Sequence, residues 1–286
     1  MSSLNQLAQA RATAARVAEV IAEPPVAYGR ERLPEGPGRL QFRGVTVQGP
    51  DGPVLNDLSL TIPGGALVAV VGRSGSGKSL LAAPAGRLVD PDEGEVLLDG
   101  VPLRRLAREE VRRAVAYGFE RPVLLGETFA DAIGFGPRAP SPEELAAQAR
   151  AARADGFIRR MPAGYASRVA DTPICGGEAQ RVGLARAFVQ AGRVLILDDV
   201  AAGLDTVTEH HISQVLTGAL ADRTRLIVTH RTSTADRAEL VVWLAGGGVR
   251  GQGTHRDLWA DPEYRATFQA LSVPRAPVRT APGGVR

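Results

Sequence analysis

The stretch 66-ALVAVVGRSGSGKS-79 decides the fold that this sequence predicts. Its first six residues form a continuous apolar run, which favours a strand buried on both faces of a parallel sheet. The next eight residues, 72-GRSGSGKS-79, fit the pattern Gly-x-x-x-x-Gly-Lys-[Ser/Thr] at every specified position. A buried strand, a glycine-rich loop and a helix in this order predict a site for a phosphate group.

The chemistry of phosphate binding explains the residue types of this loop. Glycines let the backbone N–H groups wrap around one anion, and the following helix directs its positive end at the same charge. Lys78 would reach the β- and γ-phosphates of a nucleotide, and the Ser79 hydroxyl would ligate Mg²⁺. Lys78 is also the only lysine among the 34 lysine and arginine residues, which favours a nucleotide site over a plain surface loop. The predicted phosphate-binding residues are Gly72, Arg73, Ser74, Gly75, Ser76, Gly77, Lys78 and Ser79.

A second buried run, 194-VLILDD-199, ends in two adjacent carboxylates. A phosphate loop needs a further anchor for its metal, and an acid at the end of a neighbouring strand supplies one. The first acid, Asp198, fits this role and is the predicted metal ligand beside Ser79. A helix-capping role for Asp198 is the weaker alternative, because four apolar residues lead straight into the acids.

Composition sets limits on the class of protein. The chain has 286 residues, is 44% hydrophobic and carries a net charge of +3. This length allows a sizeable core, and so small a positive excess does not argue for a nucleic-acid partner. The single cysteine, Cys175, excludes an internal disulfide. No stretch approaches the ~18 apolar residues that span a bilayer, so we expect a cytosolic chain.

The spacing of apolar residues predicts the remaining organisation. Residues 1–23 carry an apolar stripe at helical spacing, and a loose Pro- and Gly-rich linker follows at 24–38. Ser141, Pro142 and Glu144 have the spacing of a helix start with a capping box. The alternation of buried strands with helices predicts a parallel sheet with helices packed against it. Strands are expected at 40–47, 58–62, 66–71, 194–199 and 225–230, with hairpins at 94–103 and 240–255, and helices near 177–188 and 261–271.

Further segments resemble the motifs of the nucleotide-binding domain of ABC transporters. The segment 174-ICGGEAQRVGLARA-187 resembles the family's signature, Leu-Ser-Gly-Gly-Gln, and the helix after it. The segment 203-GLD-205 resembles the D-loop, His230 the switch histidine, and 119-FERPVLLGETFADAI-133 the Q-loop. The resemblance covers about residues 39–270, and the signature separates this family from other P-loop ATPases.

The resemblance implies an α/β fold: a P-loop NTPase core with a parallel sheet, an antiparallel β-subdomain and a helical subdomain. Together with the apolar spacing and composition, it predicts three regions: an N-terminal helix and linker at 1–38, an ABC ATPase domain at 39–271 with its helical subdomain at about 124–190, and a disordered tail at 272–286. Residues 1–25 are similar to the last cytoplasmic turns of an exporter's membrane domain. The chain would then be an excised domain, or the pore would lie on another polypeptide.

The family's mode of action gives the expected partners. Two such domains close head to tail over two ATP molecules with Mg²⁺, each ATP lying between the phosphate loop of one chain and the signature of the other. The domain would power a transmembrane exporter at the inner face of the cell membrane. The signature and D-loop residues expected on the nucleotide are Cys175, Gly176, Gly177, Glu178 and Asp205.

The resemblance places the catalytic positions at Asp199, His230 and Glu120. His230 is the residue of the family, whereas Asp199 and Glu120 depart from it. Asp199 stands where the family has a glutamate that polarises the attacking water, and its carboxylate falls about 1.5 Å short. A misplacement near 1 Å costs on the order of 100-fold in rate. Glu120 replaces the Q-loop glutamine, a ligand of Mg²⁺ and water. Cys175 and Glu178 replace the signature serine and glutamine. These departures predict slow hydrolysis.

The adenine-stacking aromatic of the family falls on Gly49, so we expect weak base stacking unless Phe42 or a linker residue substitutes. Two other functions stay open. One is a module that dimerises on ATP and hydrolyses almost none. The other is a soluble ABC ATPase of DNA repair or translation, although such proteins usually carry a coiled-coil insertion or tandem ATPase domains.

Overall fold

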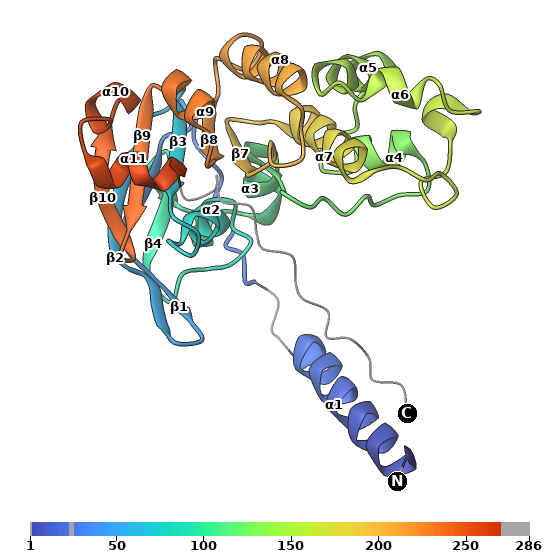
Figure 1. The fold of residues 1–286 in the computed structure, drawn as a ribbon, viewed down its shortest axis with the longest axis horizontal. Coiled ribbons are helices and arrows are strands. Elements are labelled where there is room, and N and C mark those ends of the chain that lie inside the picture. The colour runs from blue at the N-terminus through green and yellow to red at the C-terminus, as the bar shows by residue number, and fades with distance from the viewer. Residues whose placement is uncertain (1, 23–25, 270–286) are drawn as a thin grey trace, which may run out of the picture.

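The computed structural model describes residues 2–22 and 26–269 and shows an α/β fold with two sheets (Figure 1). In the larger sheet, β3 pairs in parallel with its two neighbours and β7 does the same, whereas the edge strand β10 is antiparallel to β9. The predicted parallel sheet is therefore confirmed. Its strand order is β10 (Gly248–Gly253), β9 (Leu240–Ala245), β3 (Leu67–Gly72), β8 (Thr224–Val228), β7 (Val194–Asp198) and β6 (Val115–Gly118).

The smaller sheet is antiparallel, as the family resemblance implies. Its central strand β1 pairs with β2 on one side and β4 on the other, with register shifts that mark bulges. The hairpin expected at 94–103 is present and turns at Asp99 and Gly100. The strand order is β2 (Gly52–Ile62), β1 (Leu40–Gly49), β4 (Glu93–Leu98) and β5 (Val101–Pro102).

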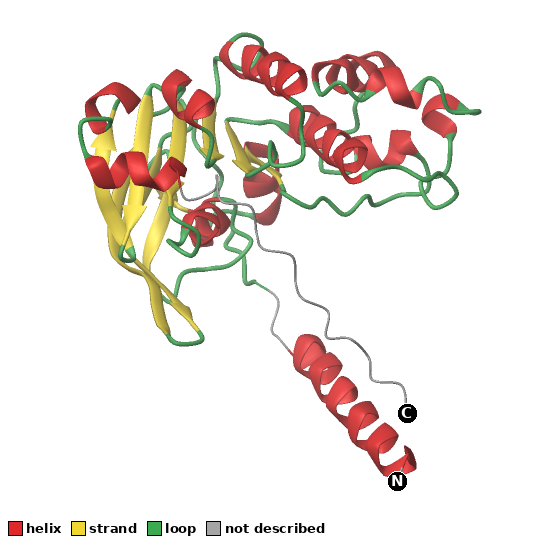
Figure 2. Cartoon of the chain, in the orientation of Figure 1, coloured by secondary structure: helices red, strands yellow, loops and turns green. Residues whose placement is uncertain are grey.

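Helices surround the larger sheet and also form a separate group. Figure 2 shows most strands gathered on one side of the molecule and a cluster of helices on the other. That cluster contains α4 (Phe129–Gly134), α5 (Pro142–Ala151), α6 (Asp155–Ile158), the short η2 (Gly164–Ala166) and α7 (Gly176–Gln190). Nearer the sheets lie α2 (Lys78–Ala85), η1 (Leu103–Arg105), α3 (Arg108–Ala114), α8 (Thr206–Thr217), α9 (Thr232–Arg237), α10 (His255–Leu258) and α11 (Pro262–Gln269).

Ser141 caps α5, as its spacing predicts, but only half of the capping box forms. The Ser141 hydroxyl accepts a hydrogen bond from the backbone N–H of Glu144 at 3.2 Å. The Glu144 carboxylate pairs with Arg138 instead of returning to the Ser141 backbone. A nearby arginine therefore outcompetes the reciprocal bond.

The core divides into two clusters on either side of the larger sheet. Successive residues of β3 alternate between them: Leu67, Ala69 and Val71 pack with the helical group, and Val68 and Val70 pack with the smaller sheet. Every residue of β3 is buried. The continuous apolar run at 66–71 thus reflects burial on both faces, as predicted, and this burial fixes the start of the phosphate loop.

The N-terminal part contains the expected helix, α1 (Ser2–Ala22), which stands clear of the body in Figure 1. Two residues of its apolar stripe, Val17 and Ile21, are exposed. None of the helices in the described residues is long and apolar enough to cross a membrane. The tail expected at 272–286 lies outside the described residues, and the domain boundaries stay predictions.

The linker is not loose after residue 25, contrary to expectation. The backbone N–H groups of Gly29 and Glu31 donate to the carbonyls of Leu106 and Arg105, at 3.1 and 2.9 Å. The guanidinium of Arg87, which is 1% exposed, bonds to the carbonyl of Ala27 and lies 4.2 Å from the ring of Tyr28. These contacts hold the segment against the body, although its proline and glycine content is typical of a linker.

Candidate functional site

The phosphate loop runs from the end of β3 to the first turn of α2. Gly75 and Gly77 have φ angles of 81° and 90°, in the region that favours glycine. A Cβ atom at Gly77 would lie 2.7 Å from Leu55 Cδ2, whereas one at Gly75 would meet open space. The loop thus needs glycine for its backbone path at both positions and for close packing at Gly77.

Lys78 is folded over this loop. Its ammonium group donates hydrogen bonds to the carbonyls of Gly72 and Arg73, each at 2.9 Å. Burial lowers the pKa of Lys78 below its ordinary value, and the carboxylates of Asp199 and Asp198 partly oppose that shift. A half-buried cation held by two neutral carbonyls is free to exchange them for phosphate oxygens, which bind an ammonium group more strongly.

Ser79 and Asp198 meet from different elements, as the metal-site prediction requires. The Ser79 hydroxyl donates to Asp198 Oδ1 at 2.9 Å. The hydroxyl of Tyr117 donates to the other carboxylate oxygen, Oδ2, at 3.1 Å. Burial raises the pKa of Tyr117, and the Asp198 charge raises it further, so the phenol keeps its proton. One hydroxyl and one carboxylate, completed by phosphate oxygens and water, form a typical Mg²⁺ site.

The second acid, Asp199, lies beside His230, the residue that resembles the switch histidine of the family. Asp199 has a left-handed φ of 47°, and its N–H donates to the carbonyl of Val228 at 3.1 Å. Its Oδ1 atom lies 3.1 Å from His230 Nδ1, close enough for an ion pair if the imidazole is protonated. Oδ1 nevertheless has no hydrogen-bond partner, which shows that its contact with His230 lacks the geometry of a hydrogen bond.

Unpaired polar atoms support a ligand site here. Within the described parts of the chain, the buried side-chain atoms that lack a hydrogen-bond partner are Ser76 Oγ and Asp199 Oδ1. Buried polar atoms are usually paired, so such exceptions point to a missing partner. One atom lies in the phosphate loop and the other next to Asp198, the predicted metal ligand, which fits a phosphate with its cation and water.

Glu120 does not join this group. Its side chain is 52% exposed and pairs weakly with Arg121 at 3.8 Å. Among the described residues, no hydrogen bond or ion pair connects Glu120 with Asp198, Asp199 or Ser79. The structure therefore leaves the predicted metal and catalytic roles of Glu120 without a contact.

The predicted signature residues lie at the start of α7. Cys175 is exposed and precedes the helix, and its N–H donates to Glu178 Oε2 at 3.0 Å. Gly176 has open space where a side chain would lie, and Gly177 approaches the carbonyl of Gly203. The hydrogen bonds and ion pairs of the described residues do not link this segment to the phosphate loop of its own chain.

Asp205 of the D-loop-like segment caps α8. Its carboxylate accepts hydrogen bonds from the N–H and the hydroxyl of Thr208, at 2.9 and 2.8 Å. The backbone bond from Thr208, followed by the hydroxyl bond, lowers the pKa of Asp205. In this structure the Asp205 side chain therefore holds a helix start.

The predicted substitutes for an adenine-stacking ring fare differently. Phe42 is wrong for this role, because it is 2% exposed and belongs to the core between the sheets. Tyr28 of the linker is engaged by Arg87 and accepts a hydrogen bond from Arg112 at 3.0 Å. A Cβ atom at Gly49 would lie 2.6 Å from Val54 Cγ2, so a ring there needs the neighbouring strand to move.

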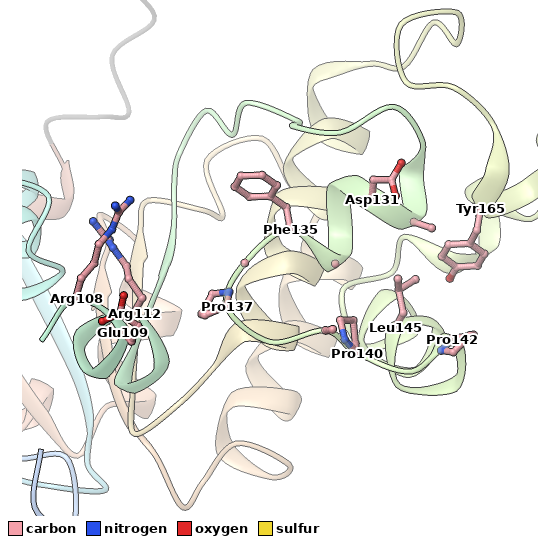
Figure 3. A pocket seen from close by; sticks show the side chains of 14 residues that line it. Arg108, Glu109, Arg112, Asp131, Phe135, Pro137, Pro140, Pro142, Leu145 and Tyr165 are labelled. Atoms are coloured by element: carbon pink, nitrogen blue, oxygen red, sulfur yellow. The ribbon is translucent and has the colours of Figure 1, made fainter. Parts of the chain in front are cut away.

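Two adjoining cavities form a groove between α3 and β6 on one side and the helical group on the other. It comprises a cavity of about 1090 Å³, shown in Figure 3, and a second of about 400 Å³ that shares Arg112, Phe135, Gly136 and Pro137 with it. Tyr117 and Phe119 line the second cavity. Apolar side chains are unusually exposed along it: Phe119, Val123, Leu125 and Phe135 are 38%, 68%, 43% and 52% exposed.

A phosphate loop between a buried strand and a helix, with a carboxylate at the end of a neighbouring strand, defines a P-loop nucleotide-binding domain. The chain belongs to the ABC transporter family, whose profile matches residues 55–202. This confirms the family resemblance and the fold class, and makes the chain an ATP-binding domain of that family.

Individual relatives include an ABC transporter ATP-binding protein and a lipid A-core flippase. The ABC transporter ATP-binding protein RamA of Streptomyces coelicolor is 52% identical over 270 residues, covering 94% of this chain and 42% of the relative. An ATP-dependent lipid A-core flippase of Pseudomonas fluorescens is 36% identical over 256 residues, covering 88% of this chain and 43% of the flippase. The chain therefore spans less than half the length of these relatives.

A solved structure of an ABC exporter is also similar to this chain. A bacterial Atm1-family ABC exporter with ATP bound superimposes with a TM-score of 0.77 and 32% sequence identity. The match covers 89% of this chain and 45% of the exporter chain.

Proposed function

We propose that this chain is the ATP-hydrolysing domain of an ABC-type exporter and acts as a head-to-tail dimer that encloses two ATP molecules. The observation that carries the proposal is the meeting of Lys78, Ser79 and Asp198 at the ends of β3 and β7. Cargo selection belongs to the membrane-spanning partner, so the chemistry of this site does not define the transported substrate.

Each residue of the site has a distinct task in this proposal. The N–H groups of the phosphate loop and the Lys78 ammonium bind the β- and γ-phosphates. Ser79 and Asp198 would hold Mg²⁺, with Glu120 joining after its loop moves; the cation would neutralise charge on the transferring phosphate. Asp199 would orient the attacking water, and His230 would contact the γ-phosphate.

We expect hydrolysis to be slow. Asp199 is one methylene shorter than the glutamate of the family, and Glu120 adds a negative charge where the family has a neutral amide. Both changes disfavour the reaction without removing the groups that bind phosphate. We therefore expect the isolated chain to bind ATP but to cleave it only slowly.

Two surfaces support the proposed partners. The exposed start of α7 offers the N–H groups of Gly176 and Gly177 to the γ-phosphate held by another copy or by a related domain. The groove, with its exposed Phe119, Val123 and Phe135, offers an apolar seat for a segment of the transmembrane partner. With that partner the domain would lie at the cytoplasmic face of the membrane.

Two alternatives are distinguished by what happens to bound ATP. A dimerisation module would form a dimer with ATP that persists for hours and yields no ADP. A soluble ABC ATPase of DNA repair or translation would hydrolyse ATP and gain activity with nucleic acid rather than with a membrane partner.

The decisive experiment measures mass and hydrolysis together. The full chain is analysed by light scattering with ATP and Mg²⁺ while phosphate release is followed. We expect an ATP-dependent dimer that decays as phosphate appears. Lys78→Ala should abolish both effects, whereas Arg104→Ala, which removes a cation that is 61% exposed, should change neither. A wild-type chain that neither dimerises with ATP nor releases phosphate would refute the proposal.

A further inference from the structure

Tyr117 is a residue of the site that the sequence motifs did not indicate. It lies on β6, the strand next to β7, and opposite Ile196 in the parallel register. Its hydroxyl donates to Asp198 Oδ2 at 3.1 Å while Ser79 holds Oδ1 at 2.9 Å. Both oxygens of the proposed metal ligand are therefore fixed by hydroxyl groups from two different elements.

The position of this hydroxyl is set by packing. The Tyr117 ring packs against the core cluster between the sheets. A Cβ atom at Gly86 would lie only 2.6 Å from its Cδ2 atom, so the ring fills the space that this glycine leaves. Its centroid is 4.6 Å from that of Phe119, with a tilt of 38° between the rings. A ring held on several sides presents its hydroxyl in one place.

The same ring faces the groove. Tyr117 and Phe119 both line the 400 Å³ cavity, and Phe119 is 38% exposed there. A continuous path of contacts therefore runs from the groove surface through Phe119 and Tyr117 to Asp198. Glu120 offers no such path among the described residues, since its side chain pairs with Arg121.

We propose that Tyr117 is a positioning residue that orients the Asp198 carboxylate toward the cation and transmits the state of the groove to it. This inference rests on the proposed function, because it assumes that Asp198 binds the cation that accompanies ATP. Partners that orient a metal ligand typically contribute 10–100-fold to metal affinity. Loss of one hydroxyl, with the ring kept, should fall within that range.

The first test isolates the hydroxyl. The affinity of the full chain for a fluorescent, non-hydrolysable ATP analogue is measured with Mn²⁺ and with EDTA, and the ratio of the two reports metal binding. We expect Tyr117→Phe to reduce this ratio about 10-fold and to leave the affinity in EDTA unchanged.

The matched control removes the same kind of bond far from the nucleotide. Tyr165 donates to Asp155 Oδ1 at 2.7 Å within the helical group, so Tyr165→Phe loses a phenol–carboxylate bond of the same type. It should keep the wild-type ratio. If Tyr117→Phe also keeps the wild-type ratio, the positioning role is refuted. If the wild type binds no analogue, the proposed function itself fails.

The second test concerns the path from the groove. Phe119→Ala removes the ring that packs on Tyr117, and the control Val17→Ala shortens an exposed apolar side chain of α1, outside the groove. We expect Phe119→Ala to reduce the ratio of the affinities in Mn²⁺ and EDTA and Val17→Ala to leave it unchanged. Equal Mn²⁺-to-EDTA affinity ratios in the wild type and in Phe119→Ala would overturn the proposal that the two rings transmit the state of the groove.

Discussion

Lengthening the second acid by one methylene, in Asp199→Glu, should accelerate ATP hydrolysis. The added carbon–carbon bond moves the carboxylate by about 1.5 Å. In the structure the shorter side chain stops 3.1 Å from His230 Nδ1 and makes no hydrogen bond through Oδ1. Since a misplacement near 1 Å costs on the order of 100-fold in rate, we expect a gain of about 10–100-fold in kcat. This corresponds to about 1.4–2.7 kcal/mol of barrier.

The same substitution should lower stability. Asp199 has a φ of 47°, and aspartate is tolerated in this left-handed region better than most residues. Glutamate adopts a left-handed φ less readily than aspartate, so we expect a loss of up to about 1 kcal/mol in the free energy of unfolding. For a chain of this size, that is ~2–4 °C in Tm.

The assay is steady-state phosphate release at saturating ATP and Mg²⁺, combined with thermal unfolding. Asp199→Asn is the matched control, because asparagine has the same length and also tolerates a left-handed φ. It should lose hydrolysis and keep Tm. Unchanged turnover in Asp199→Glu would show that reach does not limit the reaction. Wild-type turnover in Asp199→Asn would show that the carboxylate plays no part.

Three further predictions test the core, the loop and a buried histidine. Phe42→Leu should lower the free energy of unfolding by about 1–2 kcal/mol, measured by denaturant titration, without changing the affinity for fluorescent ATP. Weakened ATP binding at unchanged stability would instead indicate that Phe42 contacts the base. Gly77→Ala should abolish ATP binding, because the new Cβ meets Leu55 at 2.7 Å and φ is 90°, and wild-type affinity in this variant would contradict the assignment of the loop. Burial lowers the pKa of His255, whose Nδ1 lies 2.7 Å from the Tyr264 hydroxyl, below its usual 6.5. The unfolded chain then binds more protons, so stability should fall as pH drops below ~6.5, and His255→Gln should flatten part of that slope in pH-dependent unfolding.

Long, uniform patterns made most of the fold predictable from the sequence. The apolar runs at 66–71 and 194–197 lie in inner strands of the sheet because both of their faces are buried, and this leaves a signal in the sequence. Strand β6 was missed. It has four residues, follows α3 without a loop and forms the edge of the sheet, so it is too short to show a period.

The predicted phosphate-binding and metal-ligating residues could be proposed from the sequence, because a phosphate loop and an acid at the end of a strand leave recognisable patterns. Ser79 and Asp198 meet as the pattern requires. Tyr117 was not predictable, since its role depends on which strand lies beside β7. The expectation that Phe42 could stack on adenine is wrong. Phe42 is near the expected base site in the sequence, but its ring belongs to the core between the sheets.

The single lysine and the single cysteine of this chain are two sites for selective chemical modification without mutagenesis. Cys175 is exposed at the start of α7, whereas the amine of Lys78 is occupied by two carbonyls. A maleimide dye should therefore label the signature region at a single position. An amine-reactive reagent that modifies the loop would report when Lys78 leaves those carbonyls. Fluorescence from the thiol label could then follow the approach of two copies in real time on the unaltered sequence.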